Sequence, residues 1–473
     1  MKAEELRANM SILFKKLQKK LSPPQIIALS FLLITLVGGV LLSLPISHRQ
    51  GIDVPVLDAF FTSVSAVCVT GLVTLTTSAT WSWFGKLIIL ILIQIGGLSL
   101  VTVLAFFMIN IGKKVSLKNR LTIQTAFNYS SLGGMVRMVL LVIKGTFICE
   151  TVGAAILFFS FLNQGIVWYK SIFYGIFHSV SAFCNAGFDV VGEQSFIPYC
   201  TNLSVNIVVM TLIIIGGIGF TVWKDVINKT AYLFSARIKQ QQHLSLHTRL
   251  VLIMTAVLIV SGTVFFLVVE YNNPETLGGR SFPQKLLAAL FQSVTLRTAG
   301  FSTISQEGLT DASKLISSLF MLIGGSPGGT AGGVKTVTLA IIMCSVWSII
   351  KGRKKIVVFE RTISAITLQK ALTIIILMLL LLFFGTAILA VTENHTAFSH
   401  SATDLLFEVS SALGTVGLST GITPHLSGLG KLVLMLCMFI GRIGPITLII
   451  SLTHGIHDAD DLVGYPTEDV MIG

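Results

Sequence analysis

Long apolar segments separated by short polar ones run through the chain from Pro23 onward. A helix needs roughly 20 apolar residues to cross a bilayer, and eight or more segments here qualify. Shorter apolar stretches lie between them. One of these, Val56 to Val69, is too short to cross and suits a re-entrant half-helix. The pattern predicts an all-α, multi-pass membrane protein.

One pattern occurs four times along the chain: a long apolar segment, a short helix that ends in glycine, and a second long apolar segment. The short helices read FFTSVSAVCVTGL, FHSVSAFCNAGF, FQSVTLRTAGF and FEVSSALGTVGL, and they end at Gly71, Gly187, Gly300 and Gly417. These glycines are 116, 113 and 117 residues apart. The segments that follow repeat too, as IGGLS, IGGIG, IGGSP and IGRIG. Because two series of motifs repeat at the same period, we predict four fused units around a central pore. Each unit consists of a helix, a re-entrant pore helix and a second helix, which gives eight transmembrane helices and four pore loops.

The unit boundaries are placed in the polar stretches between the repeats. Residues 1–21 are predicted to form a basic amphipathic helix on the cytoplasmic membrane surface, and residues 457–473 a cytoplasmic tail. The four predicted pore units cover residues 22–112, 113–235, 236–350 and 351–456.

The composition indicates the class of protein, and the distribution of charge indicates its orientation in the membrane. Hydrophobic residues make up 53% of the chain and charged residues 11%, which excludes a soluble protein. The 33 Lys and Arg exceed the 21 Asp and Glu, but the surplus lies mainly in the linkers between units and indicates cytoplasmic loops rather than nucleic-acid binding. Both termini are therefore predicted to be cytoplasmic, with the pore helices entering from outside. The six scattered cysteines indicate neither a disulfide framework nor a zinc site.

Each pore helix leads into three residues that end in the repeated glycine. A ring of backbone carbonyls can replace the hydration shell of a cation, and glycine allows the carbonyl to turn without a Cβ clash. Small residues also pack membrane helices, but four loops in register favour an ion filter. The predicted filter residues are Val69, Thr70, Gly71, Asn185, Ala186, Gly187, Thr298, Ala299, Gly300, Thr415, Val416 and Gly417.

The glycine-rich stretch Ile323–Thr336, IGGSPGGTAGGVKT, interrupts the last apolar segment of the third unit. Non-helical backbone at membrane depth survives only where protein covers it or it lines a watery cavity. It is not a Walker A phosphate loop, because Val334 separates Gly333 from the lysine and no strand precedes it. Its predicted intramembrane loop covers residues 324–336 and includes Gly324, Gly325, Gly328, Gly329, Gly332, Gly333 and Lys335.

Arg442 lies in the middle of the last apolar segment, where an arginine must face the interior and have a partner. That partner is a carboxylate or a set of loop carbonyls, and the arginine is also a candidate barrier in the pore. Glu150 is a candidate partner for Lys335 or Arg442, and the sequence does not choose between them. His178 occupies a varied polar position of its pore helix, which favours a helix-face contact over a metal ligand.

These motifs resemble the Trk/Ktr/HKT superfamily of potassium transporters, and most closely the Ktr-type bacterial membrane subunit. The resemblance covers the chain from Pro23 to Gly473 and includes the four filter loops, the glycine-rich break, the arginine of the last segment and the terminal YPTEDVMIG. It implies potassium uptake through a gated, channel-like filter in the bacterial inner membrane, stimulated by sodium. In this family a glycine in all four loops goes with potassium selectivity and a serine in the first with sodium transport, so Gly71 favours potassium.

The resemblance also implies how the pore is closed and assembled. Residues 324–336 would form a gating loop below the filter, with Lys335 and Arg442 as charged parts of the gate. The third filter loop is one residue shorter than the others, and Arg297 before it is expected to brace the filter from behind. The implied assembly is a homodimer on a cytoplasmic ring of nucleotide-binding regulatory subunits of the RCK/KTN type, with the nucleotide only on that partner.

Two other classes remain as alternatives. A sodium-selective or cation-coupled secondary carrier also uses broken helices at the membrane midplane, but its repeats are commonly inverted, whereas these four run in one direction. An intramembrane enzyme would need a cluster of His, Asp and Glu or a Ser/His pair, and the apolar segments contain no such arrangement. The chain is therefore predicted not to be an enzyme, with potassium as its ion and sodium as the second candidate.

Overall fold

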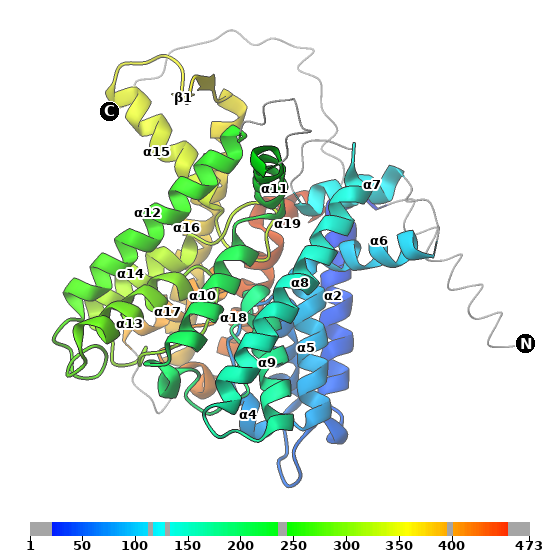
Figure 1. Ribbon diagram of the computed structural model, residues 1–473, viewed down its shortest axis with the longest axis vertical. Helices are drawn as coiled ribbons and strands as arrows, with labels where there is room; N and C mark the ends of the chain where they lie inside the picture. Colours follow the sequence, from blue (N-terminus) through cyan, green and yellow to red (C-terminus); the bar gives the residue numbers. More distant parts are fainter. Residues whose placement is uncertain (1–20, 112–116, 128–132, 235–243, 395–400, 453–473) are drawn as a thin grey trace, which may run out of the picture.

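The computed structural model describes residues 21–111, 117–127, 133–234, 244–394 and 401–452 (Figure 1). The predicted N-terminal helix over 1–21 lies, apart from its last residue, outside the described residues, and so does the predicted tail over 457–473. The structure is helical apart from two short strands, which confirms the helical fold predicted from the sequence.

Each repeat begins with a long apolar helix. The sequence predicts eight transmembrane helices; among the described residues, four helices are individually long and apolar enough to cross a membrane, or up to seven if each bent pair of helices counts as one span. Two of the four begin with a serine whose side chain accepts from a backbone N–H of the first turn, and at the start of α2 the Ser22 N–H donates to Gln25 Oε1 at 2.9 Å. The four are α2 (Pro23–Leu42), α8 (Met135–Leu162), α12 (Leu246–Val269) and α16 (Ala365–Glu393).

Each long helix packs against a shorter pore helix that follows it. The contact is close because a glycine of the long helix faces a side chain of the pore helix: Cβ atoms added at Gly38, Gly153 and Gly262 would overlap the hydroxyl oxygens of three pore-helix serines. Small residues at such crossings let membrane helices approach. The same serines donate to carbonyls of the long helices, as Ser63 Oγ does to Thr35 O at 2.8 Å. The pore helices are α3 (Val56–Val67), α9 (Trp168–Phe183), α13 (Phe282–Thr295) and α17 (Ala402–Gly414).

The last helix of three units is not a straight span. The sequence predicts one span over Phe84–Asn110, but α5 (Trp83–Leu98) and α6 (Leu100–Asn110) meet at 89°. The bend lies at the fifth position of the IGGLS motif, where Ser99 has φ 66°, and Gly219 and Gly444 take the left-handed conformation at the same place. The two other bent pairs are α10 (Leu203–Gly217) with α11 (Phe220–Phe234), at 100°, and α18 (Gly428–Ile443) with α19 (Pro445–Leu452), at 95°.

The third unit breaks at the equivalent position in a different way. Helix α14 (Asp311–Leu322) ends in non-helical backbone, and α15 (Thr336–Ile350) begins after it. The glycine-rich stretch is therefore a break in a helix, as its composition predicts. Ile323 and Val334 form a parallel bridge that holds the two ends of the break together.

The remaining elements connect these helices. A two-stranded antiparallel hairpin follows α15, with Val357 paired to Thr362. In Figure 1 the hairpin, α7, α11 and α19 lie at the upper end of the molecule and α4 at the lower end. The connecting elements are η1 (Pro45–Ser47), α4 (Thr77–Thr80), α7 (Leu117–Phe127), η2 (Ile197–Tyr199), β1 (Val357–Val358), β2 (Arg361–Thr362) and η3 (Thr423–His425).

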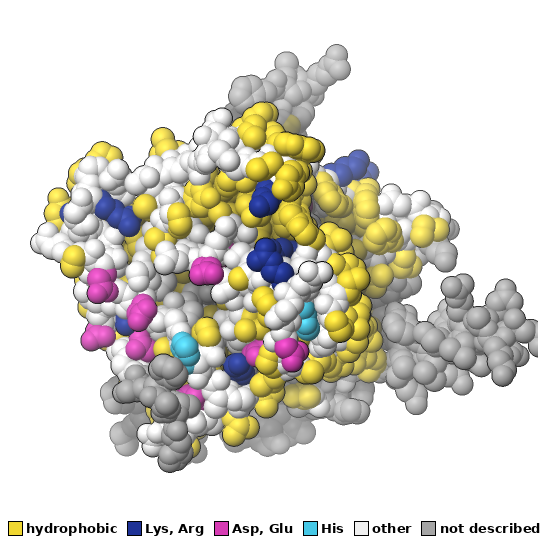
Figure 2. Space-filling model, turned by 90° about the horizontal axis from the view of Figure 1, so that it is seen from below, with side chains coloured by type: hydrophobic (Ala, Val, Ile, Leu, Met, Phe, Trp, Pro, Cys, Tyr) yellow, Lys and Arg dark blue, Asp and Glu magenta, His cyan; other side chains and the backbone are white. Residues whose placement is uncertain are grey.

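Figure 2 shows the lower face. Charged and histidine side chains are scattered over its left and central parts, and hydrophobic side chains gather along its right and upper right border. Helices α2, α12 and α16 also expose long rows of leucine, isoleucine and valine side chains. Such surfaces suit contact with lipid chains.

Two ion pairs join neighbouring units near the lower ends of the helices. Lys314 of α14 binds Asp404 of α17 at 2.9 Å, and Lys431 of α18 binds Asp58 of α3 at 2.6 Å. The second pair joins the last unit to the first, although the two residues are 373 positions apart. These pairs therefore help to close the four units into a ring.

Replacing Lys431 with methionine is expected to destabilise the protein by about 3 kcal/mol, because it leaves the Asp58 carboxylate with no cation in a site where its side chain is 8% exposed. The midpoint of thermal unfolding in detergent measures the effect. The double variant Lys431→Met/Asp58→Asn should recover much of the loss, and Lys370→Met on the exposed face of α16 serves as the control. Equal stability of Lys431→Met and the wild type would contradict a role for this pair.

Candidate functional site

The twelve residues of the four predicted filter loops come together at the centre of the molecule. In each loop the first residue has a left-handed backbone although none is glycine: φ is 56° at Val69, 60° at Asn185, 63° at Thr298 and 52° at Thr415. The third residue, always glycine, is also left-handed, with φ between 69° and 94°. All twelve are buried except Gly417, which is partly exposed. A left-handed backbone is uncommon for residues other than glycine, and here it occurs at the same position of all four loops. The surrounding structure therefore imposes one geometry on all of them.

The four glycines meet in a closed cycle. A Cβ added at Gly187 would lie 2.8 Å from Ala299 O and 2.8 Å from the Cα of Gly300, both in the next loop. A Cβ at Gly71 would overlap Ala186 O in the same way. In the same way, a Cβ at Gly300 would overlap Val416 O of the fourth loop, and a Cβ at Gly417 would overlap Thr70 O of the first loop, which closes the cycle. The middle carbonyl of each loop therefore lies against the glycine of its neighbour around one axis.

A hydroxyl near the end of each pore helix holds the following loop, a contact that was not predicted from the sequence. Ser65 Oγ accepts from Gly71 N–H and Ser411 Oγ accepts from Gly417 N–H, both at 3.0 Å. In the other two units Ser181 Oγ donates to Phe188 O at 2.8 Å and Thr295 Oγ1 donates to Phe301 O at 2.6 Å. The signal was present in the repeat, because a serine or threonine stands six residues before three of the glycines and five before Gly300.

The polar position that differs among the pore helices connects three of the four helices to the segment after the filter loop; in the first unit Thr62 Oγ1 instead donates to Asp58 O of its own helix at 2.8 Å. His178 Nε2 is hydrogen-bonded to Val190 N–H at 3.2 Å, and Gln292 bonds Gln306 at 2.7 Å. Glu408 accepts hydrogen bonds from Ser419, from Thr423 and from the N–H of Thr420. All three pore-helix side chains are fully buried. The contact predicted for His178 is thus a packing contact within its own unit.

Arg297 lies behind the third filter loop. Its side chain is 4% exposed, and Nη2 donates to Thr255 Oγ1 of α12 at 3.3 Å. The guanidinium therefore extends outward to the long helix of its unit, in agreement with the expected bracing position.

The glycine-rich loop lies against the filter loops. A Cβ at Gly332 would overlap Thr415 Oγ1, and one at Gly324 would lie 3.1 Å from Thr298 Cγ2. The backbone of the loop is bonded to the second unit: Ser326 N–H donates to Gly217 O at 2.8 Å, and Phe220 N–H donates to Gly328 O at 3.0 Å. Its backbone is therefore partnered by protein, as non-helical backbone at membrane depth requires.

Thr330 holds the loop through three hydrogen bonds. Its N–H donates to Gly216 O at 3.1 Å, and its Oγ1 donates to Phe183 O at the end of pore helix α9 at 3.0 Å. Its carbonyl accepts from Nη1 of Arg442. The sequence alone does not point to this residue, because a lone threonine among glycines carries no recognisable signal.

Arg442 bridges the loop to the first unit. Besides Thr330 O, its Nη2 donates to the carbonyls of Gly96 and Gly97, the latter at 3.3 Å. Its partners are therefore backbone carbonyls rather than a carboxylate: one belongs to the predicted loop, at Thr330, and two belong to the last turn of helix α5. Lys335 bonds within its own loop, with Nζ 2.7 Å from Ala331 O. Both cations line a small cavity of about 120 Å³ beside the loop, together with Gly97, Gly329 and the α19 residue Thr447.

The proposed pairing of Glu150 with Lys335 or Arg442 is wrong. Glu150 accepts from Gln94 Nε2 at 3.3 Å and from Cys184 Sγ at 3.9 Å. It is 5% exposed and lies between α5 and the second pore helix. The sequence could not show this, because Gln94 and Cys184 belong to different units and carry no charge.

The chain is similar to known cation transport proteins. Residues 23–461 match the model of the TrkH family, described as cation transport protein. The chain is 38% identical over 464 residues to the potassium/sodium uptake protein NtpJ of Enterococcus hirae, which covers 98% of this chain and 100% of that protein. It is 36% identical to the Ktr system potassium uptake protein B of Bacillus subtilis, over 96% of this chain and 97% of the relative.

A solved structure shows the same fold. The crystal structure of the potassium transporter TrkH from Vibrio parahaemolyticus superposes with a TM-score of 0.67 at 18% sequence identity. The match covers 89% of this chain and 84% of that one. At this identity the likeness concerns the fold.

Proposed function

Because this chain belongs to the family of cation transport proteins, we propose that it is the ion-translocating subunit of a potassium uptake system. It is an ion transporter and not an enzyme, and potassium is the ion that its relatives' names share. The single observation that carries the proposal is the closed cycle of four loops with one repeated left-handed backbone.

The cycle is proposed as the potassium filter. Carbonyl oxygens of the middle residues, Thr70, Ala186, Ala299 and Val416, stand next to the neighbouring glycines, and such a ring can replace water around a cation. The hydroxyls of Thr70 and Thr415 are buried and, among the described residues, have no hydrogen-bond partner. Buried polar groups are normally paired, so we propose that these two oxygens add to the carbonyls as contacts for a cation or its water, with the Thr415 hydroxyl on the side of the glycine-rich loop.

Residues 324–336 are proposed as the gate. The loop lies against two of the filter loops and is tied to the second unit by its backbone and to the first by Arg442. These bonds hold a glycine-rich segment that has little stability of its own. Breaking them would free the loop to leave the path, and the positive charges of Lys335 and Arg442 oppose a cation while it is closed.

The wider setting follows from the family. We propose a homodimer in the bacterial inner membrane, with both termini and the inter-unit linkers in the cytoplasm. A cytoplasmic ring of RCK/KTN-type subunits would bind the nucleotide and act on the gate. Sodium is proposed as a stimulating ion, and the name of the Enterococcus hirae relative, a potassium/sodium uptake protein, supports testing it.

A sodium-selective or cation-coupled carrier is the second candidate, and the same name supports it. The two candidates differ in what drives the ion. A pore discharges an imposed potassium gradient by itself, whereas a coupled carrier moves potassium only with a second ion.

The deciding experiment measures potassium flux into liposomes that contain only this purified chain. We expect flux that discharges an imposed potassium gradient without nucleotide, proton gradient or sodium gradient, and for which excess sodium does not compete. Flux that begins only after a sodium or proton gradient is imposed would establish the carrier instead. A chain that passes sodium as readily as potassium would contradict the filter assignment.

A further inference from the structure

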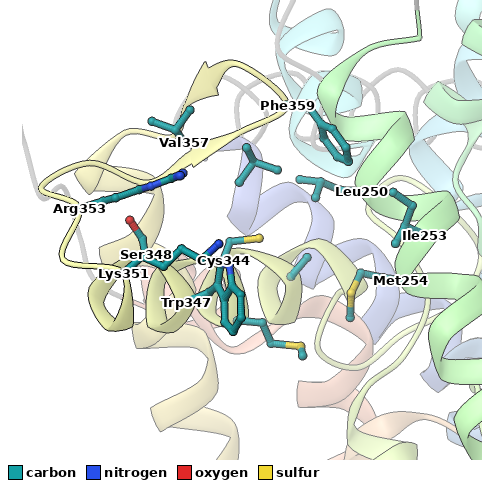
Figure 3. A pocket seen from close by; sticks show the side chains of 13 residues that line it. Leu250, Ile253, Met254, Cys344, Trp347, Ser348, Lys351, Arg353, Val357 and Phe359 are labelled. Carbon is teal, nitrogen blue, oxygen red and sulfur yellow. The ribbon is translucent and has the colours of Figure 1, made fainter.

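A second hollow lies far from the filter, between α12, the C-terminal half of α15 and the β1–β2 hairpin (Figure 3). Its volume is about 580 Å³, which is within the range of about 300–1,000 Å³ typical of ligand pockets. The filter and the gating loop contribute none of its lining residues. The proposed pathway therefore does not account for it.

The floor of this hollow is apolar. Leu250 and Met254 of α12 and Ala340 of α15 are 7%, 8% and 3% exposed and form a separate small core. Around them Ile253, Met343 and Trp347 are 47%, 54% and 60% exposed. The hollow is thus continuous with the hydrophobic surface that faces lipid, and a hydrocarbon chain can enter it from the side.

The rim is basic. Lys351 ends α15 and Arg353 follows it, and both line the hollow. Lys351 Nζ lies 4.7 Å from the centre of the Trp347 ring. Among the described residues neither cation forms an ion pair, since the two pairs observed involve Lys314 and Lys431. No Asp or Glu lines the hollow.

The hairpin closes the hollow on the side away from the filter. Its two-residue turn places Phe359 and Glu360 in the left-handed conformation, with φ of 49° and 63°. Figure 3 shows Phe359 directed toward Leu250, and Arg353 reaching beneath the hairpin. The guanidinium of Arg249 lies 5.8 Å from the centre of the Phe359 ring. Glu360 faces a neighbouring hollow that it shares with Arg249 and Arg361.

We propose that this hollow binds one anionic phospholipid, with an acyl chain on the apolar floor and the phosphate between Lys351 and Arg353. A tryptophan and basic residues at the end of a membrane helix mark the level of lipid headgroups, and basic pockets between membrane helices on the cytoplasmic side hold anionic headgroups. A free phosphate would leave the apolar floor unused. Because α15 begins directly after the gating loop, the lipid would contact the helix that continues that loop.

The test is native mass spectrometry of the purified chain after equilibration with equal amounts of phosphatidylglycerol and phosphatidylcholine of matched chains. We expect the wild type to retain phosphatidylglycerol in roughly tenfold preference. The variant Lys351→Gln/Arg353→Gln should bring the ratio close to one. Ile253→Trp, which fills the hollow from an exposed position, should reduce the amount of tightly retained phosphatidylglycerol.

The matched control is Lys229→Gln/Lys370→Gln, which removes two positive charges from α11 and α16, outside the hollow. It should keep the wild-type ratio. Unchanged retention of phosphatidylglycerol by Lys351→Gln/Arg353→Gln would overturn the proposal, and so would equal thermal stabilisation by inorganic phosphate. A cross-link from Phe359→Cys to a second copy of the chain, with no lipid retained, would show that protein covers the hollow instead. None of these readouts depends on transport, so a failed filter assignment would leave them interpretable.

Discussion

Replacing Gly71 with serine is expected to lower the preference for potassium over sodium at least tenfold. At φ 92° a side chain is strained, and its Cβ would overlap Ala186 O in the next filter loop. Such strain costs on the order of 1–3 kcal/mol, and about 1.4 kcal/mol corresponds to a factor of ten in an equilibrium. The loop must shift, and with it the carbonyls proposed to surround the ion. Competitive potassium and sodium flux into liposomes measures the ratio.

Gly51 provides the matched control. It has φ 83°, close to that of Gly71, but nothing lies within 4 Å of a Cβ added there. Gly51→Ser therefore carries the same backbone strain without the clash, and its selectivity should equal that of the wild type. Unchanged selectivity in Gly71→Ser would argue against this loop as part of the filter. A loss in both variants would point to a general effect of strain rather than to the filter.

Replacing Arg442 with alanine is expected to raise basal potassium flux at least tenfold in liposomes without any partner protein. The change removes the bonds from the guanidinium to the carbonyls of Thr330, Gly96 and Gly97, which tie the loop to the first unit. Each hydrogen bond to a charged group contributes about 1.5–3 kcal/mol. Losing two or more shifts the equilibrium of the loop toward the open position. Deleting residues 328–333 should raise flux as well.

Two further variants separate tethering from charge. Arg442→Lys keeps the charge but has one nitrogen and cannot reach both groups of carbonyls, so its flux should rise if the tether closes the pore. Lys335→Gln removes the positive charge of a side chain whose hydrogen bonds go to carbonyls of the same loop. The flux through this variant should rise if the charge closes the pore by repelling the cation. Wild-type flux in Arg442→Ala, in protein that elutes as a single species on size exclusion, would place the gate elsewhere.

The sequence was sufficient for the elements that depend on local composition and on repetition. Apolar length determines which segments cross the membrane, because backbone in lipid must bond to itself. Four matches at one period were enough to identify the repeated loop glycines, since a pattern that occurs four times exceeds chance. The break after α14 was equally visible, because glycine and proline rarely occur together inside a stable helix.

The bends at Ser99, Gly219 and Gly444 show where sequence reasoning was insufficient. The apolar run continues through each of them, so hydrophobicity alone predicts one straight helix. The left-handed backbone at these positions is a property of a single residue. Whether φ is positive there depends on what the neighbouring units place next to the residue: a Cβ at Gly219, for example, would overlap Pro327 O of the glycine-rich loop.

Partners across units were also beyond the sequence. Glu150 meets Gln94 and Cys184 rather than a cation, and Arg442 meets three carbonyls that any residue could supply. The sequence by itself determined that this chain is a fourfold-repeated helical membrane protein with a glycine at each loop. Only the tertiary structure decided which loop contacts which, because backbone carbonyls carry no sequence signal and their positions depend on how the four units close.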